Sequence, residues 1–239
     1  MFVERRARTT VLVAVVALFL GAVTATAAAA EDEELLDVGK TVSSLEKKMS
    51  ELHGRGQWAR KGLLSASAVC ADAPADTVFS SWGDGATYVP TPAGDLEDLD
   101  QWSVNKHAAR AENSPFGRGS SSLFLGEKGE AISPAMCVSV GHPTIRLFAA
   151  NTAGAESELE VEVLYEGFDG KIKKLKLARL RGGSEWAPTS IVPIYVNLLG
   201  AASEDGFTAI ALRFKARGVK NKSGGWKLDD LYVDPLKSW

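Results

Sequence analysis

The sequence is poor in the residue types that many enzymes use for metal or nucleophilic chemistry. Its 239 residues include three histidines and two cysteines. The histidines, His53, His107 and His142, lie far apart and match no zinc-binding spacing. There is no G-x-S-x-G nucleophile motif, and the glycine-rich piece at residues 117–120 lacks the flanking strand and helix of a phosphate-binding loop. We therefore expect neither a zinc site nor an enzyme.

The sequence also lacks an excess of positive charge. The chain carries 27 lysines and arginines against 30 aspartates and glutamates. Residues 1–30 hold three of the arginines and one of the glutamates, so the remainder of the chain is more acidic still. This charge disfavours binding to nucleic acid and gives no general attraction to anionic membranes. Nucleic acid is therefore not expected as a partner.

Residues 1–30 differ in composition from the rest of the chain. Arg5, Arg6 and Arg8 precede an apolar run at residues 11–23, and an alanine-rich stretch ends at Ala30. The pattern is typical of a secretory signal peptide. One alternative is an uncleaved anchor, because the uncharged stretch reaches the roughly 20 residues that span a bilayer. Another is a twin-arginine signal, which the residues around the arginine pair fit poorly.

We accordingly expect a secreted, extracellular protein, with the bacterial cell envelope as a second location and membrane contact only if the signal is uncleaved. Two cysteines exported to an oxidising compartment are expected to pair. We predict a disulfide between Cys70 and Cys137 that stabilises the fold by about 4 kcal/mol on a chain-entropy estimate. The alternative is two unpaired, buried thiols.

A short helical segment or linker is predicted at residues 31–66. Its apolar side chains recur at spacings of three and four residues, which indicates an amphipathic helix; they are Leu35, Val38, Val42, Leu45, Met49 and Leu52. These apolar side chains span fewer heptads than most coiled coils need, which favours a single helix packed on the domain or tethered to it. Self-association through residues 31–66 is the alternative.

Residues 67–239 have the pattern of an all-β domain. Apolar and charged residues alternate along residues 158–165 and again along 171–179, which predicts an antiparallel hairpin. A three-residue loop with Gly170 left-handed sets Val163 opposite Leu175 and Glu162 opposite Lys176, and hydrophobic matching favours it over a two-residue turn. The outer charged rows then form cross-strand pairs worth a few tenths of a kcal/mol each.

Several more short strands are expected, separated by turn-forming residues. They cover residues 78–82, 122–125, 135–140, 144–150, 191–197, 207–214 and 226–233. Many short strands without intervening helical patterns predict an antiparallel β-sandwich, or jelly roll.

Two motifs at the ends of this domain support a more specific assignment. Gly94-Asp95-Leu96-Glu97 is followed by Trp102, and the last predicted strand contains Asp229-Asp230 between hydrophobic residues. The pair resembles galactose-binding-like jelly-roll domains, in particular carbohydrate-binding modules with a Gly-Asp-Phe-Glu motif near the first strand. Leu96 replaces the usual Phe. The cysteine arrangement is also similar to that of secreted bacterial proteins of unassigned function.

This resemblance implies a structural calcium ion with Asp95, Glu97, Asp229 and Asp230 as candidate ligands. Adjacent acidic residues repel one another, and a hard cation bound by oxygen atoms relieves that repulsion. The alternative is that Asp229 and Asp230 are solvated or hydrogen-bonded to backbone. Because neighbours on a strand point to opposite faces, at most one of these two aspartates is expected to be a direct ligand.

The resemblance also implies a noncatalytic module that binds glycans or the cell envelope, with a carbohydrate as the expected partner. Sugar recognition uses exposed flat rings together with a few polar groups. The candidate rings are Trp82, Trp102, Trp186 and Tyr195, and the alternative for each is a place in the core. The alternative function is an envelope structural or protein-interaction scaffold without a sugar ligand.

Overall fold

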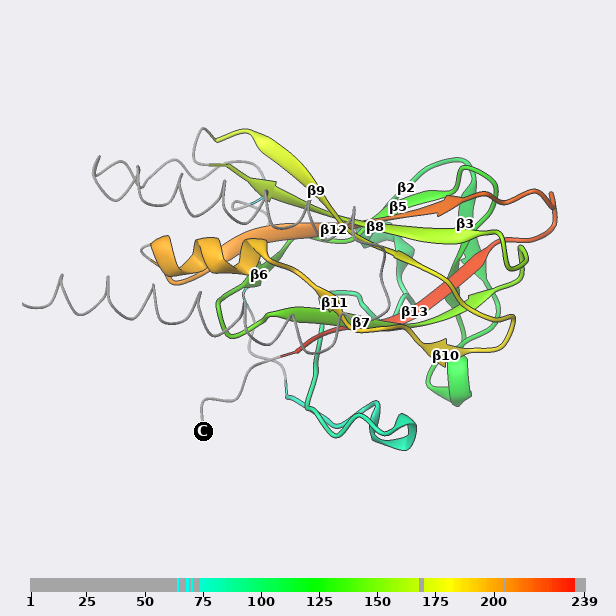
Figure 1. The fold of residues 1–239 in the computed structure, drawn as a ribbon, viewed down its shortest axis with the longest axis horizontal. Helices are drawn as coiled ribbons and strands as arrows, with labels where there is room; N and C mark the ends of the chain where they lie inside the picture. The colour runs from blue at the N-terminus through cyan, green and yellow to red at the C-terminus, as the bar shows by residue number, and fades with distance from the viewer. Residues whose placement is uncertain are drawn as a thin grey trace, which may run out of the picture. The chain divides into compact units, whose positions relative to one another are not determined.

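The computed structural model describes residues 64, 68, 70, 74–167, 170–203 and 205–234. Two antiparallel sheets pack face to face (Figure 1), which confirms the predicted β-sandwich. The predicted signal peptide at residues 1–30 and nearly all of the helical segment at 31–66 lie outside the described residues. In the described part of the chain, no helix has the length and apolar character needed to cross a membrane.

The first sheet has the strand order β10-β7-β13-β4-β3, with β1 paired to β13 and β11 paired to β7. Its strands are β1 (Val89–Pro90), β3 (Ala108–Ala111), β4 (Ser122–Leu125), β7 (Thr144–Asn151), β10 (Ala187–Pro188), β11 (Val192–Pro193) and β13 (Trp226–Asp234).

The second sheet has the order β2-β5-β12-β8-β9, with β6 paired to β12. Its strands are β2 (Ser103–Val104), β5 (Glu130–Ile132), β6 (Met136–Val138), β8 (Glu158–Glu166), β9 (Ile172–Leu180) and β12 (Thr208–Arg217). Four short 3-10 helices complete the described elements: η1 (Ser80–Trp82), η2 (Leu99–Gln101), η3 (Pro115–Gly117) and η4 (Val196–Ala202).

The core lies between the sheets and follows the two-residue period of the strands. Leu159, Val161 and Val163 of β8 are buried, as is the matching row on β12. Trp226 of β13 is also buried, and its indole N–H donates a hydrogen bond to the hydroxyl of Ser157 at 2.8 Å. This bond links the start of the last strand to the turn before β8.

The β8–β9 hairpin has the predicted register. Val163 pairs with Leu175 and Glu162 pairs with Lys176, while Gly170 has the left-handed φ of 70°. A bulge beyond this point shifts the register by one residue, so that Val161 pairs with Ala178.

Two of the predicted strands are wrong, at least in part. Residues 78–82 form a turn and η1, where the left-handed Gly83 ends the helix. Phe79 in this segment is buried against Phe148 of the first sheet, and burial of this kind does not require strand pairing. Residues 191–197 give only the short β11 before η4 begins, because Tyr195 has a φ of 57° that no extended strand tolerates.

The predicted disulfide is present. Cys70 and Cys137 are bonded, with their Cα atoms 4.9 Å apart. Cys137 lies in β6, which pairs with β12. The bond therefore ties the chain that precedes the sandwich to the second sheet.

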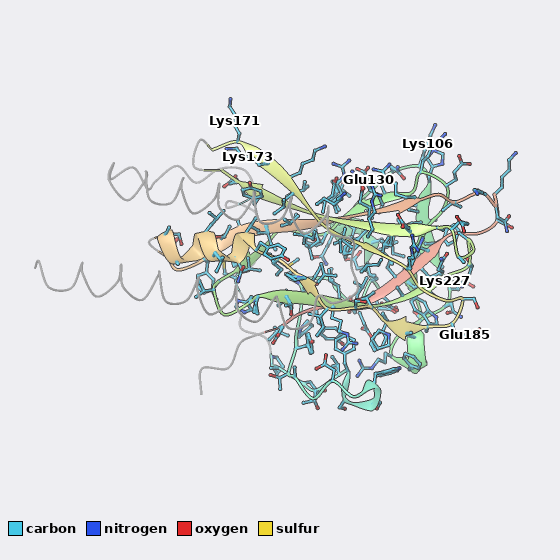
Figure 2. The ribbon with its side chains drawn as sticks, viewed as in Figure 1. Lys106, Glu130, Lys171, Lys173, Glu185 and Lys227 are labelled. Carbon is cyan, nitrogen blue, oxygen red and sulfur yellow. A yellow bond between two sulfur atoms is a disulfide. The ribbon has the colours of Figure 1, made fainter. Side chains whose placement is uncertain are left out.

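Charged side chains cover the outer face of the second sheet with a continuous set of ion pairs. Lys215 lies 2.8 Å from Glu162 and 3.6 Å from Glu160, and Arg217 lies 2.7 Å from Glu160. Arg213 joins this set to Glu130 of β5, which is labelled in Figure 2. Glu160, Glu162 and Lys215 are buried, so the removal of one partner costs more than the few tenths of a kcal/mol expected for exposed pairs.

Replacing Lys215 by methionine should therefore destabilise the domain by about 2 kcal/mol or more, because two buried carboxylates lose a partner. Urea unfolding at neutral pH measures this cost. The double variant Lys215→Met with Glu162→Gln should recover part of it. A single variant as stable as the parent would show that the pairs contribute nothing.

Candidate functional site

Residues 74–88 cover part of the outer face of the first sheet, the side turned away from the second sheet (Figure 1). Phe79 inserts there, with its ring centroid 5.1 Å from that of Phe148 and 5.7 Å from that of Tyr232. Tyr88 packs edge-on against Phe79 at 4.8 Å. This aromatic cluster forms a small second core outside the sandwich.

An ion pair closes one side of this cluster. The Arg146 guanidinium lies 4.7 Å above the Phe79 ring, pairs with Asp84 and donates to the Thr189 carbonyl at 2.8 Å. The Asp84 carboxylate also accepts a hydrogen bond from the Tyr88 hydroxyl at 2.8 Å. Burial alone would raise the pKa of Asp84, but these hydrogen bonds and the arginine charge hold it below its ordinary value.

Asp84→Asn should lower the free energy of unfolding by about 2 kcal/mol at pH 7, because Arg146 loses its charged partner. The pKa of Asp84 is lowered in the folded state, so its stabilising contribution is present above the ordinary pKa of 3.8 and is lost as pH falls through the folded value. The difference between parent and variant should therefore shrink below about pH 4 in a series of urea unfolding curves. A difference independent of pH would contradict this account.

Trp82 and Phe116 form an exposed aromatic pair beside the cluster. They come from different loops, with ring centroids 5.0 Å apart and an interplanar angle of 54°. Trp82 is 42% exposed and Phe116 is 55% exposed. Both rings also contact the buried Phe148, at 5.2 Å and 5.3 Å. The pair is thus anchored from below and open to solvent above.

The backbone of Phe116 is strained in a way that the core does not require. Its φ of 54° and ψ of 25° are left-handed, and Gly117 follows with a φ of 68°. A bulky residue in this region costs roughly 1–2 kcal/mol relative to glycine. Because the ring is mostly exposed, burial does little to offset that cost, and strain of this kind is concentrated at functional sites.

Polar groups lie around the pair. The half-buried Trp186 packs on the aromatic cluster and donates its indole N–H to Asn113 at 2.6 Å. Arg118 lies 3.7 Å from the Asp230 carboxylate and donates a long hydrogen bond of 3.4 Å to the Tyr232 hydroxyl. Rings and hydrogen-bonding groups therefore border the same face of the first sheet.

The four predicted ring residues separate into two groups. Trp82 and Trp186 lie at this face. Trp102 is buried, donates its N–H to the Ala93 carbonyl at 2.9 Å and lies 6.2 Å from Phe214 on β12. Tyr195 is half-buried next to η4, where burial raises the pKa of its hydroxyl. In the described part of the chain, no ring contact joins these last two to the exposed pair.

Phe116 was not predicted from the sequence. A signal was nonetheless present, because Phe116 lies between Pro115 and Gly117. Proline and glycine on either side of an aromatic residue indicate a turn, and turns lie at the surface.

The predicted carboxylates meet around a bulge in β13. The register with β7 shifts between Asp229 and Tyr232, and Asp230 has a left-handed φ of 49°. A bulge interrupts the regular alternation of side chains, so strand periodicity alone does not fix the faces to which the two aspartates point. Both carboxyl groups are close enough to Glu97 for its charge to raise their pKa.

These aspartates are buried with incomplete hydrogen bonding. Asp229 is 1% exposed, and burial, followed by the Asp230 and Glu97 charges, raises its pKa to about 8. Burial also raises the pKa of Asp230, and the Arg118 charge opposes that rise. The Oδ2 atoms of Asp229 and Asp230 are buried and accept no hydrogen bond from the described residues, and Asp230 Oδ2 forms an ion pair with Arg118 at 3.7 Å. Such groups destabilise a fold unless a cation or a proton neutralises them.

Glu97 has a different role from the two aspartates. Its carboxylate accepts hydrogen bonds from the Ser120 N–H and hydroxyl, both at 2.7 Å, and from the Ser121 N–H at 2.9 Å. A Cβ on Gly119 would lie 2.2 Å from Glu97 Oε1, so only glycine permits this approach. Glu97 thereby fixes the β3–β4 loop, residues 112–121.

Two oxygens of this cluster are of a kind that calcium prefers, namely the buried Oδ2 atoms of Asp229 and Asp230. Glu97, in contrast, already accepts three hydrogen bonds, and Asp95 accepts one from the Glu97 N–H at 3.4 Å. Within the described ranges, no three acidic, histidine or cysteine side chains converge in a metal-binding arrangement.

The architecture is similar to that of β-sandwich carbohydrate-binding modules. One is the xylan-binding CBM22-1 domain of Paenibacillus barcinonensis Xyn10C, with 12% identity, a TM-score of 0.40 and coverage of 58% of this chain and 87% of that one. Another is TmCBM61 in complex with β-1,4-galactotriose, with 17% identity, a TM-score of 0.34 and coverage of 60% and 95%.

The fold is also similar to part of an enzyme. The enzymatically active domain of bacteriophage CBA120 tailspike protein 4 matches with 12% identity, a TM-score of 0.39 and coverage of 62% of this chain and 21% of that one. No family model and no curated protein matches the sequence. These similarities concern the fold alone.

Proposed function

We propose that this chain is an exported, noncatalytic carbohydrate-binding module that holds a glycan against Trp82 and Phe116. The observation that carries the proposal is the exposed pair itself, with Phe116 held in a strained backbone conformation. The faces of such rings stack on the C–H groups of a pyranose, and nearby polar groups select among its hydroxyls. The disulfide between Cys70 and Cys137 supports an extracellular location.

The opposite side of the sandwich is a poorer binding surface. On the second sheet, the charges of Lys215, Arg213 and Arg217 are matched by Glu160, Glu162 and Glu130. A ligand there would have to replace these ion pairs with contacts of equal strength. This favours the first sheet and its loops as the binding side.

The proposal includes a structural calcium ion held by Asp229 and Asp230. The ion would neutralise the two buried carboxylates and thereby stabilise the bulge of β13. Glu97 would act indirectly, because it holds the β3–β4 loop over the cluster. The alternative is that Asp229 keeps a proton and no metal binds.

Retention of the purified mature protein on insoluble polysaccharides and on cell walls tests the proposal. Saturable retention that a soluble oligosaccharide competes away, and that survives removal of residues 31–66, supports a glycan-binding module. No retention on any surface, together with self-association that depends on residues 31–66, supports the interaction scaffold instead.

A further inference from the structure

We infer that the sugar bound at Trp82 and Phe116 carries a carboxylate and that Arg118 recognises it. The inference rests on the proposed function and assigns the class of glycan, namely one that contains a uronic acid. It follows from the position of Arg118 and from how little of its hydrogen-bonding capacity the protein uses.

Arg118 makes two polar contacts with the described residues, both through Nη1. They are an ion pair with Asp230 Oδ2 at 3.7 Å and a hydrogen bond of 3.4 Å to the Tyr232 hydroxyl. The side chain is 37% exposed. A guanidinium offers five N–H donors in a planar fork. Most of these donors are therefore open to a ligand.

The guanidinium and the exposed rings border the same surface. Arg118 follows Phe116 by two residues in the turn that the left-handed Gly117 shapes. Its contact Tyr232 belongs to the aromatic cluster, since its ring lies 5.7 Å from that of Phe79. Phe79 contacts Phe148, on which Phe116 and Trp82 rest. The inference therefore places Arg118 beside a sugar that is bound on the exposed pair.

Two other arginines near this surface are already engaged. Arg146 pairs with Asp84, donates to the Thr189 carbonyl and lies over Phe79. Arg110 donates from Nε to the Ser121 hydroxyl at 2.6 Å.

A carboxylate is the ligand group that best matches the free fork of Arg118. Arginine and carboxylate form two parallel charge-assisted hydrogen bonds, which a neutral hydroxyl cannot reproduce. The ion pair with Asp230 engages only Nη1, so a sugar carboxylate can bind Nε and Nη2 while that pair remains.

Calorimetry with a matched pair of ligands tests the inference: an oligosaccharide containing uronic acid, and the same oligosaccharide after chemical reduction of its carboxyl groups. The parent protein should bind the acidic form about tenfold more tightly, which corresponds to one charge-assisted pair. Arg118→Met should bind both forms with similar affinity, while Arg118→Lys, which keeps the charge but not the fork, should fall between.

Arg181→Met is the matched control, because it removes the same charge from a side chain that is 78% exposed and follows directly after β9. It should retain the full preference. Equal binding of both ligands by the parent protein would overturn the inference and leave the glycan-binding function standing. Binding of neither ligand, and of no polysaccharide, would overturn both.

Discussion

Replacement of Trp82 and Phe116 together by alanine should abolish measurable retention on the glycan that the parent protein binds. Each ring is expected to contribute about 2 kcal/mol, so each single variant should lose roughly thirtyfold in affinity. Affinity electrophoresis or calorimetry measures the change. Phe207→Ala is the matched control, because it removes an exposed aromatic side chain that has no ring contact with the pair among the described residues.

A second substitution at Phe116 distinguishes an effect on glycan binding from an effect on stability. Glycine adopts the left-handed conformation of this position without the cost that a larger residue incurs. Phe116→Gly should therefore keep or slightly raise the melting temperature while it loses binding. A variant that binds as the parent does would exclude Phe116 from the site, and a large loss of stability would show that the ring is needed for the fold.

Calcium should raise the melting temperature of the parent protein by about 5 °C or more at saturating concentration, relative to chelator. An ion present at a hundred times its dissociation constant stabilises the folded state by about 2.7 kcal/mol, and a domain of this size gains about 2–4 °C per kcal/mol. Thermal unfolding in both buffers measures the shift.

Asp229→Asn should remove most of that shift, because one of the two orphaned carboxylate oxygens is lost. In chelator the variant should be about as stable as the parent, since it no longer buries an unpartnered carboxyl group. Glu127→Gln, an exposed change elsewhere, should leave the calcium shift intact. Identical melting curves for the parent in calcium and in chelator would contradict the metal site and favour a protonated Asp229.

The sandwich was predictable from the sequence because its strands carry a local signal. Along β8, buried leucine and valine residues alternate with glutamates, and the register of the β8–β9 hairpin follows from matching those residues alone. The disulfide could also be predicted, because the sequence contains only two cysteines and a predicted secretory signal favours their pairing.

The candidate site was harder to predict, because residues that are far apart in the sequence form it. Trp82 looks like a strand residue, yet its loop crosses the outer face of the first sheet and brings it to Phe116, 34 positions later in the numbering. The bulge at Asp230 depends on backbone geometry in which a non-glycine residue adopts a positive φ. Neither feature has a local pattern, and both follow from contacts that exist only in the folded chain.

The β3–β4 loop contacts both halves of the proposed site. Phe116 and Arg118 belong to this loop, and they contact Trp82 and Asp230 respectively. Glu97 accepts a hydrogen bond from Ser120 of the same loop. An ion at the carboxylates and a sugar on the rings would therefore act on the same ten residues. If binding of one changes the position of this loop, each ligand changes the affinity of the other by the same factor.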